Sequence, residues 1–244
     1  MVKIREASPR FKARMAGIFY LLNGGTGFAF FVRSRLLVSG DAAATATNIL
    51  AHESLFRLAF AADLLGVASY VVVTALLFEL FKPVNRCISL VAAFLSLVGC
   101  AIQSSACVFD LASLDVLSGV RYSSALNPDQ LQAIVLMSLR LHGQSFNIAI
   151  VFFGFYCLLI GYLIFRSIFL PRVIGAMMAL GGLAYVANNI AMFLSLKPPR
   201  YLTHIVPALG GLGELSLMLW LISIGVNPQR WQEKAGTSSA AILP

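Results

Sequence analysis

Long apolar runs separated by short polar joints dominate the chain. Six of these runs approach or exceed the roughly 20 residues that a helix needs to cross a bilayer. Helices satisfy their own backbone hydrogen bonds, which the hydrocarbon interior requires. We therefore predict an all-α integral membrane bundle of six helices. The expected spans are about 14–32, 55–81, 87–109, 145–165, 173–196 and 204–225.

The joints between the runs carry residues that end membrane helices. The segments 81–86 (FKPVNR), 165–172 (FRSIFLPR) and 196–202 (LKPPRYL) each combine proline with basic side chains. Proline cannot continue a helix interior, and lysine and arginine resist entry into hydrocarbon. The joints are short, so we expect a single membrane domain over 1–234. The small and polar residues of 235–244 predict a disordered tail.

Two segments between the spans have helical signals of their own. In 40–56, Asp41 is a candidate N-cap, and Glu53 and Arg57 have the i,i+4 spacing of a helical ion pair. In 127–143, Asn127 can cap a helix whose first residue is Pro128. We predict amphipathic helices on the outer side of the membrane.

The segment 128–165 is long for one membrane helix. At 1.5 Å per residue it would extend about 57 Å, nearly twice the hydrocarbon thickness. Gln130 stands where the partner of a capping box is expected, so the start at Pro128 is well marked. We therefore expect a break near Gly143 that separates an interfacial helix from the true span.

Composition and charge exclude several classes of protein. Of the 244 residues, 59% are hydrophobic and 11% are charged, and the mean hydropathy is +0.85. A soluble domain carries about 25% charged residues, so this chain lacks a polar surface for water. The net charge of +8 belongs to residues that flank the apolar runs. It therefore indicates contact with the lipid bilayer and not with nucleic acid.

The basic residues also predict an orientation. If the N-terminus is cytoplasmic, eleven lysines and arginines fall on the cytoplasmic side and seven on the outer side, where the loops are longer. The positive-inside rule then places both termini in the cytoplasm.

Polar side chains inside the spans gather toward the outer half. A charged group that faces lipid costs about 2.5–3.5 kcal/mol, so these groups are expected to face one another or a water-filled recess. Arg140, Gln144 and Asn147 form a stripe with i, i+4, i+7 spacing at the outer end of the fourth span. We predict an outward-facing polar pocket for a small molecule or lipid. The candidate pocket residues are Asp63, Arg140, Gln144, Asn147, Asn188 and Glu214.

The histidines and the glycine clusters give weaker indications of a functional site. His52, His142 and His204 all fall on the outer side and could hold a metal, but no HExxH or equivalent spacing joins any two of them. We expect no metal and no cofactor, and no catalytic residue can be assigned. The glycine clusters 24–27, 181–183 and 210–213 lie within spans and complete no nucleotide-binding motif. They are typical of close helix packing.

Several stretches resemble a membrane protein family defined as domain of unknown function 4386 (DUF4386). They include ARMAGIFYLL (13–22), VRSRLLVSGDAAATATNI (32–49), FRLAFAADLL (56–65) and FKPVNR (81–86), followed by FNIAIVFFGFYCLLIGYLIFRSIFLPRVIG (146–175) and GELSLMLWLISIGVN (213–227). The resemblance implies a bacterial multi-pass protein of the plasma membrane. It brings no activity, ligand or catalytic residue with it.

Three hypotheses of function remain open at this point. The first is binding or transport of a small molecule or lipid through the predicted pocket. The second is an intramembrane metal-dependent enzyme that uses the outer-side histidines. The third is an accessory membrane protein that has no ligand and binds a partner helix. The sequence determines neither the substrate nor the oligomeric state.

Overall fold

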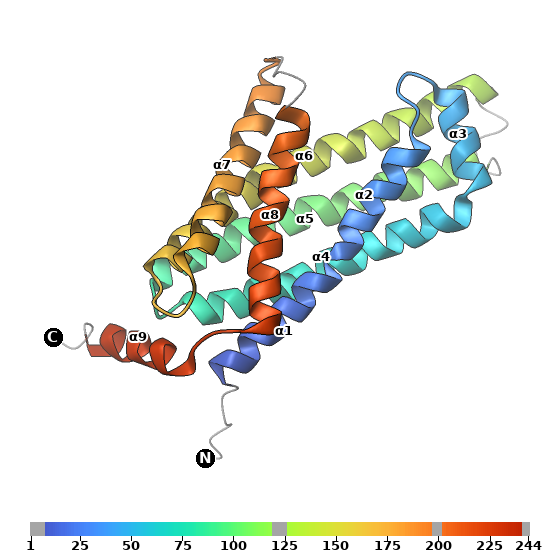
Figure 1. Ribbon diagram of the computed structural model, residues 1–244. Coiled ribbons are helices and arrows are strands. Elements are labelled where there is room, and N and C mark those ends of the chain that lie inside the picture. The colour runs from blue at the N-terminus through green and yellow to red at the C-terminus, as the bar shows by residue number, and fades with distance from the viewer. Residues whose placement is uncertain (1–7, 119–125, 197–201, 241–244) are drawn as a thin grey trace. The chain divides into compact units, whose positions relative to one another are not determined.

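A computed structural model describes residues 8–118, 126–196 and 202–240, and every regular element in this part of the chain is an α-helix (Figure 1). The helices are α1 (Pro9–Leu22), α2 (Gly24–Leu36), α3 (Ala42–Ala51), α4 (Glu53–Phe81), α5 (Arg86–Leu117), α6 (Pro128–Arg166), α7 (Arg172–Phe193), α8 (Leu202–Ser223) and α9 (Pro228–Ala240). The predicted all-α class is confirmed.

Within the described ranges, five helical segments are long and apolar enough to cross a membrane. α1 and α2 together form the first, Pro9–Leu36, and α4, α5, α6 and α7 form the others. A sixth is reached if Ala208–Ser223 and Pro228–Gly236 form one span, although they are bent by 106°. Large apolar side chains such as Leu65 and Val173 are exposed, as expected for surfaces that face lipid. The chain is a multi-pass membrane protein.

The chain divides into two compact units. Unit 1 comprises Met1–Leu21, Tyr70–Gly99 and Ile150–Pro244, and unit 2 comprises Leu22–Ser69 and Cys100–Ala149. The long helices α4, α5 and α6 contribute residues to both. The single membrane domain expected over 1–234 stays a prediction.

Unit 1 is held by close helix packing. α7 and α8 lie side by side (Figure 1), and a Cβ atom on Gly181 would lie 2.8 Å from the Cα atom of Gly210. Such a contact permits no side chain at Gly181 without movement of the backbone. The packing role predicted for the glycine clusters is therefore confirmed at this position. Tyr20 and Tyr70 meet edge to face, with ring centroids 5.3 Å apart and hydroxyl oxygens 3.2 Å apart.

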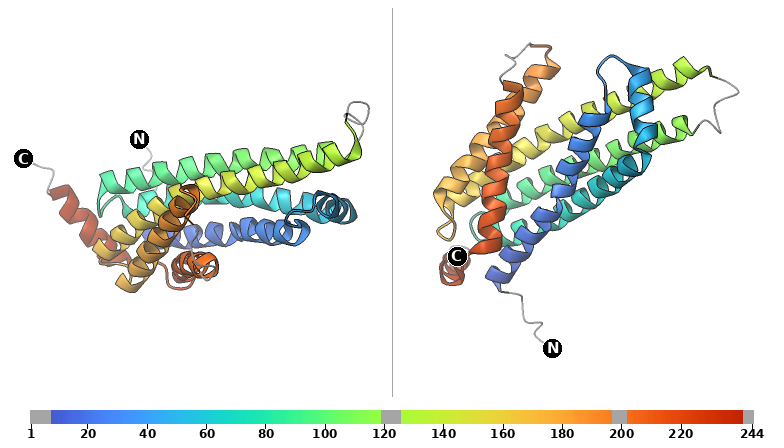
Figure 2. Two further views of the ribbon diagram at one scale, coloured as in Figure 1. Left: turned by 90° about the horizontal axis from the view of Figure 1, so that it is seen from above. Right: turned by 45° about the vertical axis from the view of Figure 1, so that its right-hand side comes forward.

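Unit 2 has an apolar core of its own. Its buried members are Ala29, Val32, Leu36, Ile49, Phe56, Ala59, Leu114, Val116, Val135 and Leu139. The parts of α5 and α6 in this unit run side by side (Figure 2). α2 approaches α4 so closely that a Cβ atom on Gly25 would clash with the carbonyl oxygen of Ala62. This core brings α2, α3, α4, α5 and α6 together.

The predicted helix starts in unit 2 are confirmed. Asp41 caps α3 by accepting a hydrogen bond from the Ala44 amide at 2.8 Å. Asn127 accepts from the Gln130 amide at 2.9 Å, and the Gln130 side chain accepts from the Asn127 amide at 3.0 Å, which is a reciprocal capping box. The Arg57–Glu53 ion pair forms at 2.7 Å.

The predicted break near Gly143 is wrong, because α6 is continuous over its 39 residues. One glycine inside a helix costs only about 1 kcal/mol relative to alanine, which neighbouring contacts can offset. The adjacent residue His142 is buried and hydrogen-bonded to the carbonyl of Ala106 on α5. That contact holds the helix to its neighbour at the point where the break was expected.

The C-terminal segment is more ordered than the sequence suggests. α9 continues to Ala240, across the first part of the predicted disordered tail, and residues 241–244 lie outside the described part. Gly225 has a φ of +73° and so permits the turn between α8 and α9. The Trp231 indole then donates a hydrogen bond to the Leu80 carbonyl at 2.8 Å, which anchors α9 within unit 1.

Candidate functional site: a buried charged cluster in unit 2

Four helices of unit 2 each contribute one ionisable side chain to a single cluster. Arg33 of α2 donates one hydrogen bond to Asp63 Oδ2 on α4 and another, of 2.7 Å, to Asp110 Oδ2 on α5. His142 of α6 lies beside both carboxylates. We call Arg33, Asp63, Asp110 and His142 the charged cluster. Asp63 is 0% exposed and Asp110 is 1% exposed, so water does not screen their charges.

α5 contributes the polar side chain of Gln103 as well as Asp110. Gln103 and Asp110 are seven residues apart and share one face of the helix. The Gln103 amide nitrogen donates to Asp63 Oδ1 at 3.0 Å. Both oxygens of Asp63 are therefore hydrogen-bonded, which fixes the orientation of this carboxylate.

His142 is held by the backbone of α5. Its Nδ1 atom lies 3.0 Å from the Ala106 carbonyl oxygen, and its Nε2 atom lies 4.0 Å from Asp63 Oδ2. A carbonyl can only accept a hydrogen bond, so Nδ1 carries the hydrogen. In the neutral imidazole, Nε2 then carries no hydrogen, and its lone pair is free on the side of the ring that faces Asp63.

One oxygen of Asp110 lacks a hydrogen bond within the part of the chain that the structure describes. Its Oδ1 atom is buried and has no hydrogen-bond partner among the described residues. His142 Nδ1 lies 3.3 Å from this oxygen, but its hydrogen bond goes to the Ala106 carbonyl. A buried acceptor without a partner costs about 1–3 kcal/mol, more if it is charged. Asp110 Oδ1 is thus ready to accept a further partner.

The charges of the cluster do not balance. Two carboxylates face one guanidinium, so the cluster has one surplus negative charge when His142 is neutral. The described residues supply no second arginine or lysine to either aspartate. Charged groups inside a membrane are expensive unless they are paired, and they commonly mark ion or substrate pathways. The arrangement therefore has the electrostatics of a cation-binding site.

The cluster also has the donor atoms of a metal site. Asp63, Asp110 and His142 each offer one ligand atom, and these three atoms lie within 4.8 Å of one another. Two carboxylate oxygens and one imidazole nitrogen make a ligand set that suits first-row divalent metals.

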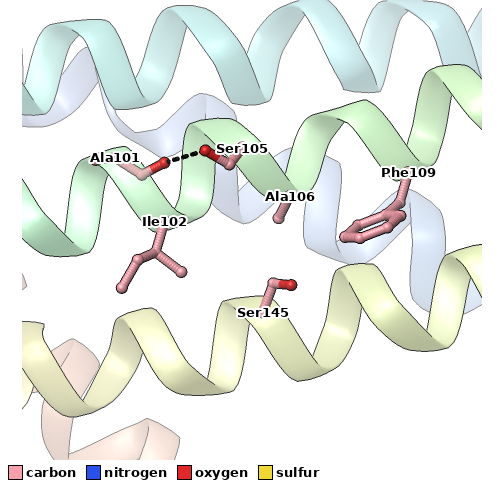
Figure 3. A pocket seen from close by; sticks show the side chains of 6 residues that line it. All are labelled: Ala101, Ile102, Ser105, Ala106, Phe109 and Ser145. Carbon is pink, nitrogen blue, oxygen red and sulfur yellow. Dashed lines mark hydrogen bonds between the residues drawn. The ribbon is translucent and has the colours of Figure 1, made fainter.

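A shallow groove of about 420 Å³ lies between α5 and α6 on the neighbouring surface (Figure 3). Its lining is mostly small or weakly polar, with Ser105 and Ser145 as its hydroxyl-bearing members. Ser105 donates its own hydroxyl to the Ala101 carbonyl at 2.9 Å. Ala106 lines the groove and also accepts the hydrogen bond from His142, so the groove borders the charged cluster.

The predicted pocket residues fall in both units. Asp63 belongs to the charged cluster, whereas Arg140 and Gln144 of α6 are exposed and Asn147 is half-buried. These four belong to unit 2. The other two candidates belong to unit 1 and are half-buried, namely Asn188 of α7 and Glu214 of α8. The thiol of Cys157 lies 3.5 Å from Glu214 Oε1 and donates to it.

The three candidate histidines have different surroundings. His142 is buried in the charged cluster, as described above. His52 is exposed at the end of α3, where its Nδ1 lies 3.0 Å from the Asn48 carbonyl oxygen. His204 lies on α8 in unit 1, and its side chain is outside the described part.

Comparison with known families decides the classification. Residues 15–225 match the profile of DUF4386, a domain of unknown function. The chain belongs to the DUF4386 family. Neither a curated protein nor a solved structure matches it. All four residues of the charged cluster lie within the matched DUF4386 region.

Two members of the cluster in this DUF4386 protein were not predicted from the sequence. Arg33 reads as a basic residue that flanks the first span, and Asp110 lies one position beyond the expected end of the third. A signal for Asp110 does exist, because it follows Gln103 by seven residues on one helix face. No comparable local pattern marks Arg33.

Proposed function

We propose that this DUF4386 protein is a membrane transporter for a small solute and that it binds a cation at the charged cluster as part of that activity. The single observation that carries the proposal is the surplus negative charge of Asp63 and Asp110 against Arg33 in a buried site of membrane-spanning helices. Intramembrane carboxylates of this kind commonly serve ion and substrate pathways.

A purely structural ion pair would have a different composition. One carboxylate would suffice to neutralise Arg33, and a second buried carboxylate adds a desolvation cost of several kcal/mol. Asp110 also keeps one oxygen without a hydrogen-bond partner among the described residues. A bound cation would remove both penalties, since it would neutralise the surplus charge and bind the idle oxygen.

The proposed orientation follows from the basic residues. Eleven lysines and arginines against seven favour cytoplasmic N- and C-termini in a plasma membrane. Arg33 then lies near the outer end of the first span, and Asp110 near the outer end of α5. On this topology the cluster is reached from outside the cell.

The outward-facing solute pocket predicted from the sequence is retained as part of the proposal. Its polar candidates Arg140, Gln144 and Asn147 lie on α6, before and after the buried His142 in the sequence. We propose these three side chains as solute contacts and the charged cluster as the cation site. The other two candidates, Glu214 and Asn188, belong to unit 1 and stay predictions from the sequence.

Thermal unfolding in a mild detergent tests the proposal. The tag-free protein is melted in chloride salts of choline, sodium, potassium, magnesium, manganese and zinc at matched ionic strength. A cation present at 100 times its dissociation constant stabilises the folded state by about 2.7 kcal/mol. At least one cation should raise the midpoint of the wild type relative to choline.

Two matched variants make the test specific. Asp110→Asn removes the idle carboxylate and should abolish the stabilisation. Asp115→Asn makes the same change at an exposed position of the same helix and should preserve it. If no salt distinguishes the wild type from Asp110→Asn, the cluster binds no cation and the proposed function is wrong.

A further inference from the structure

We propose that the cation is a divalent transition-metal ion, coordinated by Asp63, Asp110 and His142, and that Arg33 is an internal cation which this metal displaces. The proposal rests on the proposed function and identifies the class of cation. Its basis is the position of three donor atoms within 4.8 Å of one another, in a buried site shared by α4, α5 and α6.

His142 is arranged as metal-binding histidines usually are. One ring nitrogen of such a histidine donates to a carbonyl or carboxylate, and this bond fixes the ring while the other nitrogen binds the metal. Here Nδ1 is bonded to the Ala106 carbonyl at 3.0 Å, which leaves Nε2 as the ligand atom. Gln103 gives Asp63 comparable support through its 3.0 Å hydrogen bond to Oδ1.

Asp110 supplies the independent indication of a ligand. This side chain is 1% exposed, and its Oδ1 atom has no hydrogen-bond partner within the described part of the chain. The same atom lies 3.3 Å from His142 Nδ1, the ring nitrogen that is bonded to the Ala106 carbonyl. A bound metal ion would be the partner that this oxygen lacks among the described residues.

The charges explain the role of Arg33. A divalent ion would neutralise Asp63 and Asp110, whereas retention of the guanidinium between them would leave a surplus of one positive charge. Arg33 is the member of the ion-paired group with some access to the surface, because its side chain is 13% exposed and those of the two aspartates are 0% and 1%. Its long, flexible stem permits the guanidinium to leave.

The donor atoms favour particular metals. Imidazole nitrogen together with carboxylate oxygen suits manganese, iron and zinc, whereas magnesium and calcium prefer oxygen alone. Mn²⁺ is the most useful probe, since its paramagnetism reports both binding and ligand identity.

Titration of the tag-free protein with Mn²⁺, followed by electron paramagnetic resonance, tests the proposal. We expect about one Mn²⁺ per chain in the wild type, with ¹⁴N coupling from one imidazole in the spin-echo spectrum. His142→Gln should lose the ¹⁴N coupling. Asp110→Asn should weaken binding at least about tenfold, and the exposed control Asp115→Asn should not.

Arg33→Gln tests the displacement. Removal of the competing cation should tighten Mn²⁺ binding by about tenfold or more. Should this variant fold poorly without metal, added Mn²⁺ should restore its thermal midpoint, which gives a second readout. The control Arg35→Gln, at an exposed position of the same helix, should behave as the wild type.

The outcomes separate this inference from the proposed function. Equal Mn²⁺ affinity in the wild type, Asp110→Asn and His142→Gln would show adventitious binding and overturn the metal site. Stabilisation by sodium or potassium alone, lost in Asp110→Asn, would overturn the metal site and leave the cation-binding function standing. Tighter binding to His142→Gln than to the wild type would overturn the assigned ligand set.

Discussion

Arg33 Nη1 lies 2.7 Å from Asp110 Oδ2, so one hydrogen bond joins α2 to α5 across 77 positions of the sequence. Arg33 also binds Asp63, so Asp63 and Asp110 share a single guanidinium. This relationship makes the cluster more than an ion pair, because the two carboxylates leave one surplus negative charge when His142 is neutral.

Substitution of the two partners should have unequal effects on stability. Arg33→Gln leaves two buried carboxylates without a cation and should lower the free energy of unfolding by about 3–5 kcal/mol in metal-free buffer. Asp110→Asn removes the surplus charge and keeps the Arg33–Asp63 pair, so its effect should be clearly smaller. Denaturation of both variants in the same detergent measures the difference. Equal losses would mean that Asp110 is as well satisfied as Asp63.

Much of the fold follows from local sequence signals. The apolar runs, the prolines at the joints and the caps at Asp41 and Asn127 act within a few residues, and the structure confirms the helices they predict. The continuity of α6 was not predictable in this way. At this point α6 is supported by the contact of His142 with Ala106, which joins positions 36 residues apart.

Local sequence signals predict the charged cluster even less completely than they predict the fold. Asp63 was predicted to be a site residue because a carboxylate within an apolar run is conspicuous. Arg33 lies close to Arg35 at the end of a span, and the sequence offers no means of telling the half-buried arginine from the exposed one. That distinction arises only from the packing of α2 against α4, where Gly25 meets Ala62.

The packing of α2 against α4 can be tested at this glycine. Gly25→Ala would place a methyl group against the Ala62 carbonyl oxygen and should destabilise the protein by about 1–3 kcal/mol. Gly24→Ala is the matched control, because a Cβ atom there meets nothing within 4 Å. The control should be neutral or slightly stabilising, since alanine favours helix. Thermal midpoints that rank the two variants in the opposite order would contradict the described contact.

The predicted solute pocket has a test that does not depend on the cation. Native mass spectrometry of the protein in mild detergent should reveal a reproducible small molecule or lipid on the folded wild-type chain. Glu214→Gln should lose that mass while its thermal midpoint is kept, since the amide preserves the shape of the side chain. Glu233→Gln, at an exposed position, should retain the mass. Retention by Glu214→Gln would remove Glu214 from the pocket, and loss of folding would assign it a packing role.

The central claim is that the charged cluster holds a cation, and elemental analysis after equilibrium dialysis measures this most directly. The tag-free wild type and Asp110→Asn are dialysed together against one buffer that contains sodium, potassium, magnesium, manganese and zinc. The account predicts about one additional cation of a single element per wild-type chain relative to Asp110→Asn. Identical cation contents in two folded proteins would contradict it.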